Sequence, residues 1–110
     1  EYIDIAQLGI CMDISHSALA ANHFGFDFIE LIQDLSNNTE HLHIADASKS
    51  NQEGQQIGDG DLDFKEILKI YTSKSKNYTF IPEIWKGHLN NGEGFNNGLI
   101  YLDECIRSIQ

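Results

Sequence analysis

Three short apolar segments, each carrying a carboxylate or a histidine near its end, set the pattern of the chain. They are residues 8–13 (LGICMD), 40–46 (EHLHIAD) and 80–85 (FIPEIW), and a segment with helical character follows each one. In the middle segment apolar residues alternate with His41 and His43, which is typical of a short strand. We therefore expect strands at about residues 9–13, 41–45 and 78–85.

Helices are predicted between and after these strands. The hydroxyls of Ser15 and Ser17 suit the start of one helix, Asp27 can cap a second that runs to Leu35, and Asp63 can cap a third. The third is expected to end near residue 74 and a last helix to span residues 95–109, while residues 1–7 resemble the end of a helix. Residues 46–61 are polar and contain three glycines. They predict a long loop, of a length that is usually functional or mobile.

The order of elements is β-α-β-α-β-α, which implies parallel strands joined by right-handed crossovers. The polar residues then fall at the carboxyl ends of the strands, where barrels and doubly wound sheets place their sites. A complete barrel of eight units usually needs about 250 residues. The expected fold class is therefore α/β, with residues 1–110 forming a single partial domain: the C-terminal three βα units of a TIM (β/α)8 barrel.

The charge composition of the chain argues against two classes of binding partner. The formal net charge is −10, with 17 acidic against 7 basic residues. This argues against nucleic acid and against an anionic membrane surface, which both attract Lys and Arg. No apolar run approaches the roughly 18 residues of a membrane span. The two cysteines, Cys11 and Cys105, are expected to be reduced thiols in the core of a cytoplasmic protein.

The candidate chemistry consists of carboxylates and histidines at the three strand ends. Asp13 and His16 have the spacing D-x-x-H, His43 and Asp46 have the spacing H-x-x-D, and Glu83 follows a proline. Carboxylate oxygens with a neutral imidazole suit one divalent ion: Mn²⁺, Mg²⁺, Co²⁺ or Zn²⁺. The set contains no thiolate, so a structural zinc site is not expected.

Structural roles compete with this interpretation. Asp13 can be a helix cap, Asp46 can start its loop through an Asx-turn, and His41 can lie against a neighbouring strand. Glu83 is harder to explain in this way, because it lies among apolar residues and a buried unpaired carboxylate is costly.

Four segments resemble, in order, the xylose-isomerase-like TIM-barrel superfamily, which includes sugar isomerases and epimerases and endonuclease-IV-type phosphodiesterases. They are CMDISHS (11–17), HLHIADA (41–47), IGDGDLDF (57–64) and IPEIWKGH (81–88), and the resemblance extends over about residues 8–107. It implies that Asp13, His43 and Glu83 bind the metal and that His16 contacts the substrate. A fourth ligand, a glutamate on an earlier strand, would precede residue 1.

The resemblance implies catalytic roles for Glu83, which would move a proton beside a carbonyl, and for His16. Asp46, Trp85 and His88 are further candidates for substrate binding, Trp85 as a stacking face for a sugar and His88 as a contact to a hydroxyl. The expected function is a divalent-metal-dependent sugar or sugar-phosphate isomerase or epimerase that works through an enediolate.

Two other functions stay open. The first is an endonuclease-IV-like phosphodiesterase, although the D-x-H motif that this branch needs is missing from residues 52–56 (QEGQQ). The second is a non-catalytic barrel remnant or binding module. The isolated chain is expected to be inactive, and its open strand edges predict a homo-oligomer or association with the missing N-terminal part of the barrel.

Overall fold

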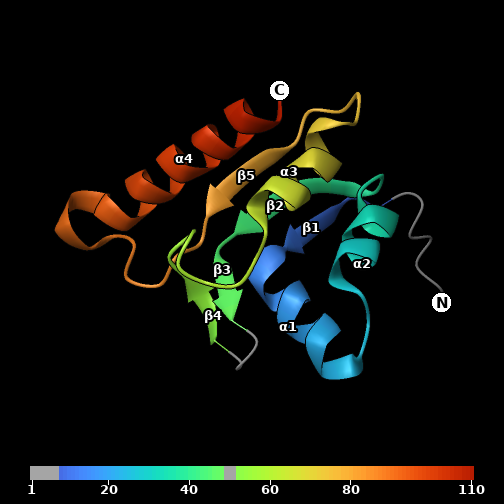
Figure 1. Ribbon diagram of the computed structural model, residues 1–110, viewed down its shortest axis with the longest axis horizontal. Coiled ribbons are helices and arrows are strands. Elements are labelled where there is room, and N and C mark those ends of the chain that lie inside the picture. The colour runs from blue at the N-terminus through green and yellow to red at the C-terminus, as the bar shows by residue number, and fades with distance from the viewer. Residues whose placement is uncertain (1–7, 49–51) are drawn as a thin grey trace.

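A computed structural model describes residues 8–48 and 52–110, and the helix end expected at residues 1–7 lies outside the described residues. The strands are β1 (Ile10–Asp13), β2 (Thr39–Ile44), β3 (Asp46–Ser48), β4 (Gln52–Gln55) and β5 (Thr79–Pro82). The helices are α1 (Ile14–Phe24), α2 (Phe28–Leu35), α3 (Phe64–Thr72) and α4 (Leu89–Ile109) (Figure 1).

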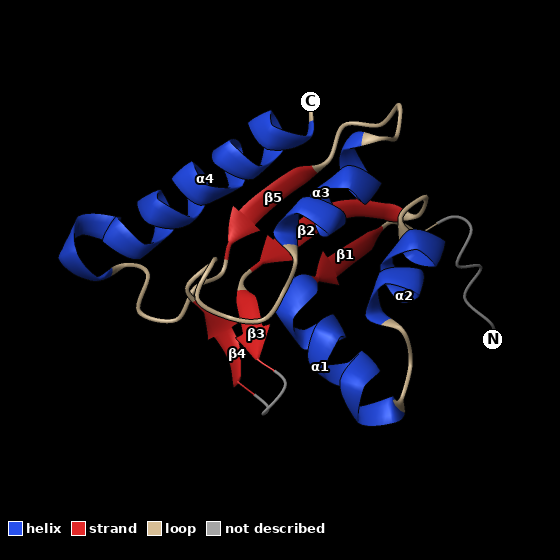
Figure 2. Ribbon diagram, viewed as in Figure 1, coloured by secondary structure: helices blue, strands red, loops and turns tan. Residues whose placement is uncertain are grey.

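The main sheet has the strand order β1-β2-β5, and both of its strand pairs are parallel. Asp13 is paired with His43, and His43 with Ile81, so the three strands end at the same edge of the sheet. This confirms the expected parallel α/β architecture. The figure shows the three carboxyl ends pointing toward the hairpin of β3 and β4 (Figure 2).

Helices cover one face of this sheet. Met12, Leu42 and Ile44 point to that face and are buried in the core with residues of α3 and α4. Successive side chains of a strand point to opposite faces. The other face, which we call the interior face because it would line a closed barrel, therefore carries the following residues in two rows: Cys11, His41 and Thr79, then Asp13, His43 and Ile81.

Aspartates begin three of the helices. The side chains of Asp13, Asp27 and Asp63 accept hydrogen bonds from the backbone N–H groups at the starts of α1, α2 and α3. The predicted caps at Asp27 and Asp63 are thereby confirmed. At α1 the cap is Asp13 rather than a serine hydroxyl, because the helix begins immediately after β1.

Two expectations were wrong in detail. The loop expected at residues 46–61 contains β3 and β4, which pair as an antiparallel hairpin. Strand β5 ends at Pro82, so Glu83 and Trp85 follow it. The expected start of the last helix near residue 95 agrees with the structure, because Asn90, Asn91 and Gly92 in the first turn of α4 have left-handed backbone angles and the regular helix begins only after them.

The prediction for the cysteines was half right. Both thiols are free, and Cys105 is buried with 4% of its surface exposed. Cys11 is exposed instead. The reason is the direction of its side chain: Cys11 lies on the interior face, away from the helices, whereas the next residue, Met12, lies in the core.

Candidate metal centre

The carboxyl ends of the three parallel strands bring Asp13, His43 and Glu83 together. One ligand atom from each residue lies within 4.8 Å of the others. Asp13 ends β1, His43 lies directly opposite it on β2, and Glu83 follows β5 by one residue. The backbone N–H of Glu83 still donates to the carbonyl of Ile44 at 2.9 Å, which fixes the point from which the Glu83 side chain extends.

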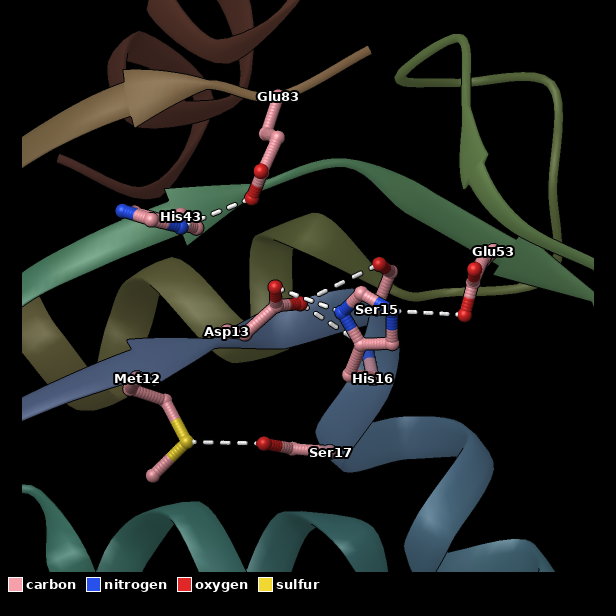
Figure 3. Close-up of polar contacts among 8 residues, drawn as sticks. All are labelled: Met12, Asp13, Ser15, His16, Ser17, His43, Glu53 and Glu83. Atoms are coloured by element: carbon pink, nitrogen blue, oxygen red, sulfur yellow. Dashed lines mark hydrogen bonds and ion pairs between the residues drawn. The ribbon is translucent and has the colours of Figure 1, made fainter. Parts of the chain in front are cut away.

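A chain of polar contacts extends this cluster toward the hairpin. His16 Nδ1 lies 2.7 Å from Asp13 Oδ2, and His16 Nε2 lies 2.7 Å from Glu53 Oε2 (Figure 3). On the other side, His43 Nδ1 lies 2.8 Å from Glu83 Oε2. Five side chains from β1, α1, β2, β4 and the end of β5 thus form one continuous polar site.

The two carboxylate oxygens of Asp13 have different partners. Oδ1 accepts the backbone N–H of His16 at 3.0 Å, which caps α1, and Oδ2 faces the His16 ring. The helix-cap interpretation of Asp13 and its place in the polar cluster are therefore compatible. A metal ion that bound Oδ2 would replace the histidine and leave the cap intact.

The electrostatics of the pair favour charges on both members. Burial of Asp13 opposes its ionisation, but the hydrogen bonds from the His16 N–H and ring outweigh this cost and lower the pKa of the carboxyl. The hydrogen bond to Asp13 raises the pKa of the His16 imidazole, against a smaller effect of burial, and the charges of Asp13, Glu53 and Glu83 raise it further. The cluster attracts positive charge, as a cation site must.

Asp46 lies outside the cluster and has 0% of its surface exposed. Its Oδ1 accepts the N–H groups of Ala47 (2.9 Å) and Leu62 (3.2 Å), and its Oδ2 accepts those of Gly58 (2.9 Å) and Gly60 (3.0 Å). Residue 60 must be glycine, because a Cβ there would collide with the Asp46 carboxylate and the Ala47 carbonyl. The Asp46 carboxylate thus holds residues 58–62, which we call the glycine loop, against β3. Both of its oxygens accept hydrogen bonds from the backbone, so neither is directed toward a substrate.

Trp85 borders a hollow beside the cluster. The hollow has a volume of about 630 Å³, and its walls are Asp59, Trp85, Lys86 and residues 52–56. The Trp85 ring packs on Gly54, its backbone N–H donates to the Gly54 carbonyl at 2.8 Å, and 69% of its surface stays exposed. Glu53 both lines this hollow and contacts His16, so the hollow borders the polar site. His88 is exposed at the start of α4.

The sequence interpretation missed Glu53. Its position in the polar run QEGQQ, far from every strand end, gave no reason to connect it with His16. The hairpin of β3 and β4 places Glu53 beside His16. The one available signal was its charge, since Glu53 is the only ionisable residue among residues 52–56.

Comparison with known proteins supplies the context of this site. A family model described as xylose isomerase-like TIM barrel matches residues 1–105. A curated relative, "Uncharacterized protein MJ1311" of Methanocaldococcus jannaschii, is 34% identical over 67 residues, which are 61% of this chain and 22% of the relative. The matched part of the chain thus spans under a quarter of that relative's length. No solved structure matches the chain. Within the described residues, no helix has the length and apolar character to cross a membrane.

Proposed function

This chain belongs to the xylose isomerase-like TIM-barrel family, and from that premise we propose that it supplies the metal-binding strands of a sugar or sugar-phosphate isomerase or epimerase. The single observation that carries the proposal is the convergence of Asp13, His43 and Glu83 at one edge of the sheet. The matched region covers 22% of the curated relative, so the activity proposed is that of a longer barrel in which these are three of the βα units.

The donor set suits a divalent cation. Two carboxylate oxygens and one imidazole nitrogen within 4.8 Å of one another are ligands for Mn²⁺, Mg²⁺, Co²⁺ or Zn²⁺. The side chains of Asp13 and Glu83 keep 27% and 52% of their surface exposed, which leaves room for substrate oxygens. When bound, such an ion supplies Lewis-acid polarisation of the hydroxyl and carbonyl oxygens of a sugar.

Glu83 is the proposed acid–base residue. Its carboxylate is more exposed than that of Asp13 and is held by the His43 ring at 2.8 Å, on the side of the cluster nearest β5. A carboxylate in this position can take a proton from the carbon beside a sugar carbonyl and return it to a neighbouring atom. The second acid–base residue of such a reaction would come from another strand of the barrel.

His16 and Trp85 are the proposed substrate contacts. His16 lies 2.7 Å from Glu53, and an incoming hydroxyl that replaces Glu53 at Nε2 would place the sugar between the cluster and the hollow. The exposed ring of Trp85 offers an apolar face on which a sugar ring can stack. His88, which is exposed at the start of α4, is a further proposed contact.

The test uses the whole gene product. We expect the protein loaded with Mn²⁺ to hold one ion per chain by elemental analysis, and to catalyse incorporation of solvent deuterium beside the carbonyl of a sugar or sugar phosphate, followed by NMR. Glu83→Gln should lose most of the metal and the exchange, because a neutral amide is a poor ligand and a poor base. Glu104→Gln, an exposed position on α4, is the matched control.

Two results would overturn the proposal. Unchanged metal content in Glu83→Gln would remove Glu83 from the ligand set. A metal-loaded protein that exchanges no sugar in the panel but cleaves a duplex with an abasic site would instead establish the phosphodiesterase function.

A further inference from the structure

A second group of side chains that could hold a metal ion lies on the interior face, one row behind the first. It consists of Cys11, His41 and His43, with one ligand atom from each within 4.8 Å of the others. Cys11 and His41 are directly paired across β1 and β2, and His43 is two residues further along the same face of β2. The function proposed above uses only His43 of these three.

Hydrogen bonds hold both imidazole rings in position. His41 Nδ1 lies 2.7 Å from the hydroxyl oxygen of Thr79 on β5, and His43 Nδ1 lies 2.8 Å from the Glu83 carboxylate. The rings meet edge to face with their centroids 5.4 Å apart. In both residues Nδ1 is engaged, and a histidine that donates from Nδ1 to an oxygen presents the lone pair of Nε2 to a metal. Figure 3 shows the second ring nitrogen of His43 directed away from Glu83.

Cys11 is exposed, which distinguishes it from a cysteine that packs in the hydrophobic core. Cys105 has 4% of its surface exposed and belongs to the core cluster, whereas Cys11 is exposed and stands beside two imidazoles. Packing therefore explains Cys105 and leaves Cys11 without a role in the core.

We propose that Cys11, His41 and His43 form a second metal site that selects Zn²⁺ over Mg²⁺ and Mn²⁺. A thiolate with two imidazoles is a soft donor set, which suits Zn²⁺ and the tetrahedral form of Co²⁺ and does not suit hard ions. Three protein ligands leave one position of a tetrahedron open. Binding converts the Cys11 thiol to a metal-bound thiolate, and the thiol proton is released to solvent.

The shared histidine couples this site to the first one. A neutral imidazole has a single lone pair, because its other nitrogen carries the proton. When His43 Nδ1 binds an ion beside Asp13 and Glu83, Nε2 carries the proton and cannot bind an ion in the second site. When Nε2 binds an ion beside Cys11, Nδ1 donates its proton to Glu83. Occupancy of either site therefore lowers the affinity of the other.

The test is a titration of the metal-free whole protein with Co²⁺. We expect the near-ultraviolet absorption of sulfur-to-cobalt charge transfer, which Zn²⁺ abolishes and Mg²⁺ does not. Cys11→Ser should lose this absorption, and the matched variant Cys105→Ser should keep it. Glu83→Gln should also keep it, because an amide oxygen still accepts the proton of His43 Nδ1. This result would stand even if the isomerase proposal failed.

A second measurement needs no change at Cys11. Cys105→Ser leaves Cys11 as the single thiol of these 110 residues, and peptide mass spectrometry reports its alkylation. Zn²⁺ at about ten times its dissociation constant should slow alkylation of Cys11 about tenfold, since only the free fraction reacts, while Mg²⁺ should have no effect. Absence of the charge-transfer band from the wild-type protein, or alkylation that is equally fast with and without Zn²⁺, would overturn the proposal.

Discussion

Asp13 contributes both to the fold and to the candidate site. One of its carboxylate oxygens caps α1, and the other belongs to the polar cluster. Asp27 caps α2 in the same way, with its carboxylate accepting the Glu30 N–H at 2.9 Å, but it lies outside the cluster. The two caps therefore allow the structural and the proposed metal-binding contributions of Asp13 to be measured separately.

Replacement of Asp13 should separate these contributions. Asn caps helices about as well as Asp, so Asp13→Asn should change the free energy of unfolding of the metal-free protein by less than about 0.5 kcal/mol, and Asp13→Ala should lower it by about 1 kcal/mol. Both variants should bind metal much more weakly, because both lose the carboxylate charge. Urea unfolding and calorimetric metal titration measure the two effects.

The control for this experiment is Asp27→Ala. It should lose about 1 kcal/mol of stability through its cap and keep the metal affinity of the wild type. If Asp13→Asn bound metal as tightly as the wild type, Asp13 would be a cap alone.

His16 makes stability depend on pH in the metal-free protein. Its pKa is raised in the folded state, so its contribution is fully present below the ordinary histidine pKa of about 6.5 and is lost as the pH rises through the raised value. The pKa of Asp13 is lowered, so its contribution is present above about pH 3.9 and is lost as the pH falls through the lowered value. The pair therefore stabilises most between about pH 4 and pH 6.5.

Urea midpoints of the wild type and His16→Gln test this dependence. The wild type should be the more stable at about pH 5.5, and the difference should shrink at about pH 8.5. His16 is 56% exposed, so we expect a modest effect that added salt weakens. His23→Gln, at the other end of α1, controls for the loss of a histidine as such. An equal difference at both pH values would exclude a stabilising charge on His16.

At the scale of elements, the glycine loop depends on one buried side chain. The Asp46 carboxylate accepts four backbone N–H groups, from Ala47, Gly58, Gly60 and Leu62. These bonds connect β3 to the segment that leads into α3.

Asp46→Ala should be among the most destabilising substitutions in the chain. It leaves four backbone donors without their acceptor, each at a cost of about 1–3 kcal/mol where water cannot replace the carboxylate, so a loss of at least about 3 kcal/mol is expected. Asp46→Asn should lose part of this, because its NH₂ group would face N–H donors. Thermal unfolding measures both variants, and Asp59→Ala, at an exposed position on the same loop, is the comparison. A loss below about 1 kcal/mol for Asp46→Ala would contradict this role.

The elements that the sequence predicts well are those with local signals. Asp27 and Asp63 mark the starts of α2 and α3, and an apolar stripe follows each of them. The hairpin was missed because β4 reads QEGQ, without apolar alternation, and its position depends on contacts distant in sequence, such as that between Trp85 and Gly54.

The same distinction holds for the site. The convergence of Asp13, His43 and Glu83 was predictable because each lies at or just beyond the carboxyl end of a parallel strand, and such ends meet in space. Glu53 arrives through the hairpin, and the exposure of Cys11 depends on which face of the sheet the helices cover. Neither the position of Glu53 nor the exposure of Cys11 can be inferred from the residues that neighbour it in the sequence.

At the scale of the whole molecule, the main sheet has two unpaired edges in the part of the chain that the structure describes. Strand β2 pairs with β1 on one side and with β5 on the other, and it alone is paired on both sides. Phe80 and Ile81 of β5 are 42% and 45% exposed. Open edges beside exposed apolar side chains favour pairing with another chain.

The 110-residue chain should therefore self-associate. Sedimentation or light scattering should give a mass that rises with concentration above that of the monomer of 12.4 kDa. Ile81→Lys should lower this mass, because a charge beside the open edge opposes pairing. Leu99→Lys, at an equally apolar and exposed position on α4, should leave it unchanged. A monodisperse monomer at all concentrations would contradict the prediction.

The open edges of β1 and β5 affect how a protein of this kind can evolve. The three proposed ligands lie on, or directly after, strands that already pair with one another, so one contiguous segment of chain carries them and their register. Recombination that exchanged the neighbouring strands would rebuild the walls around the site and leave the ligands in place. Within such a family, the substrate contacts that other strands contribute can then diverge while these three ligands are retained, because different stretches of the gene encode the two sets of residues.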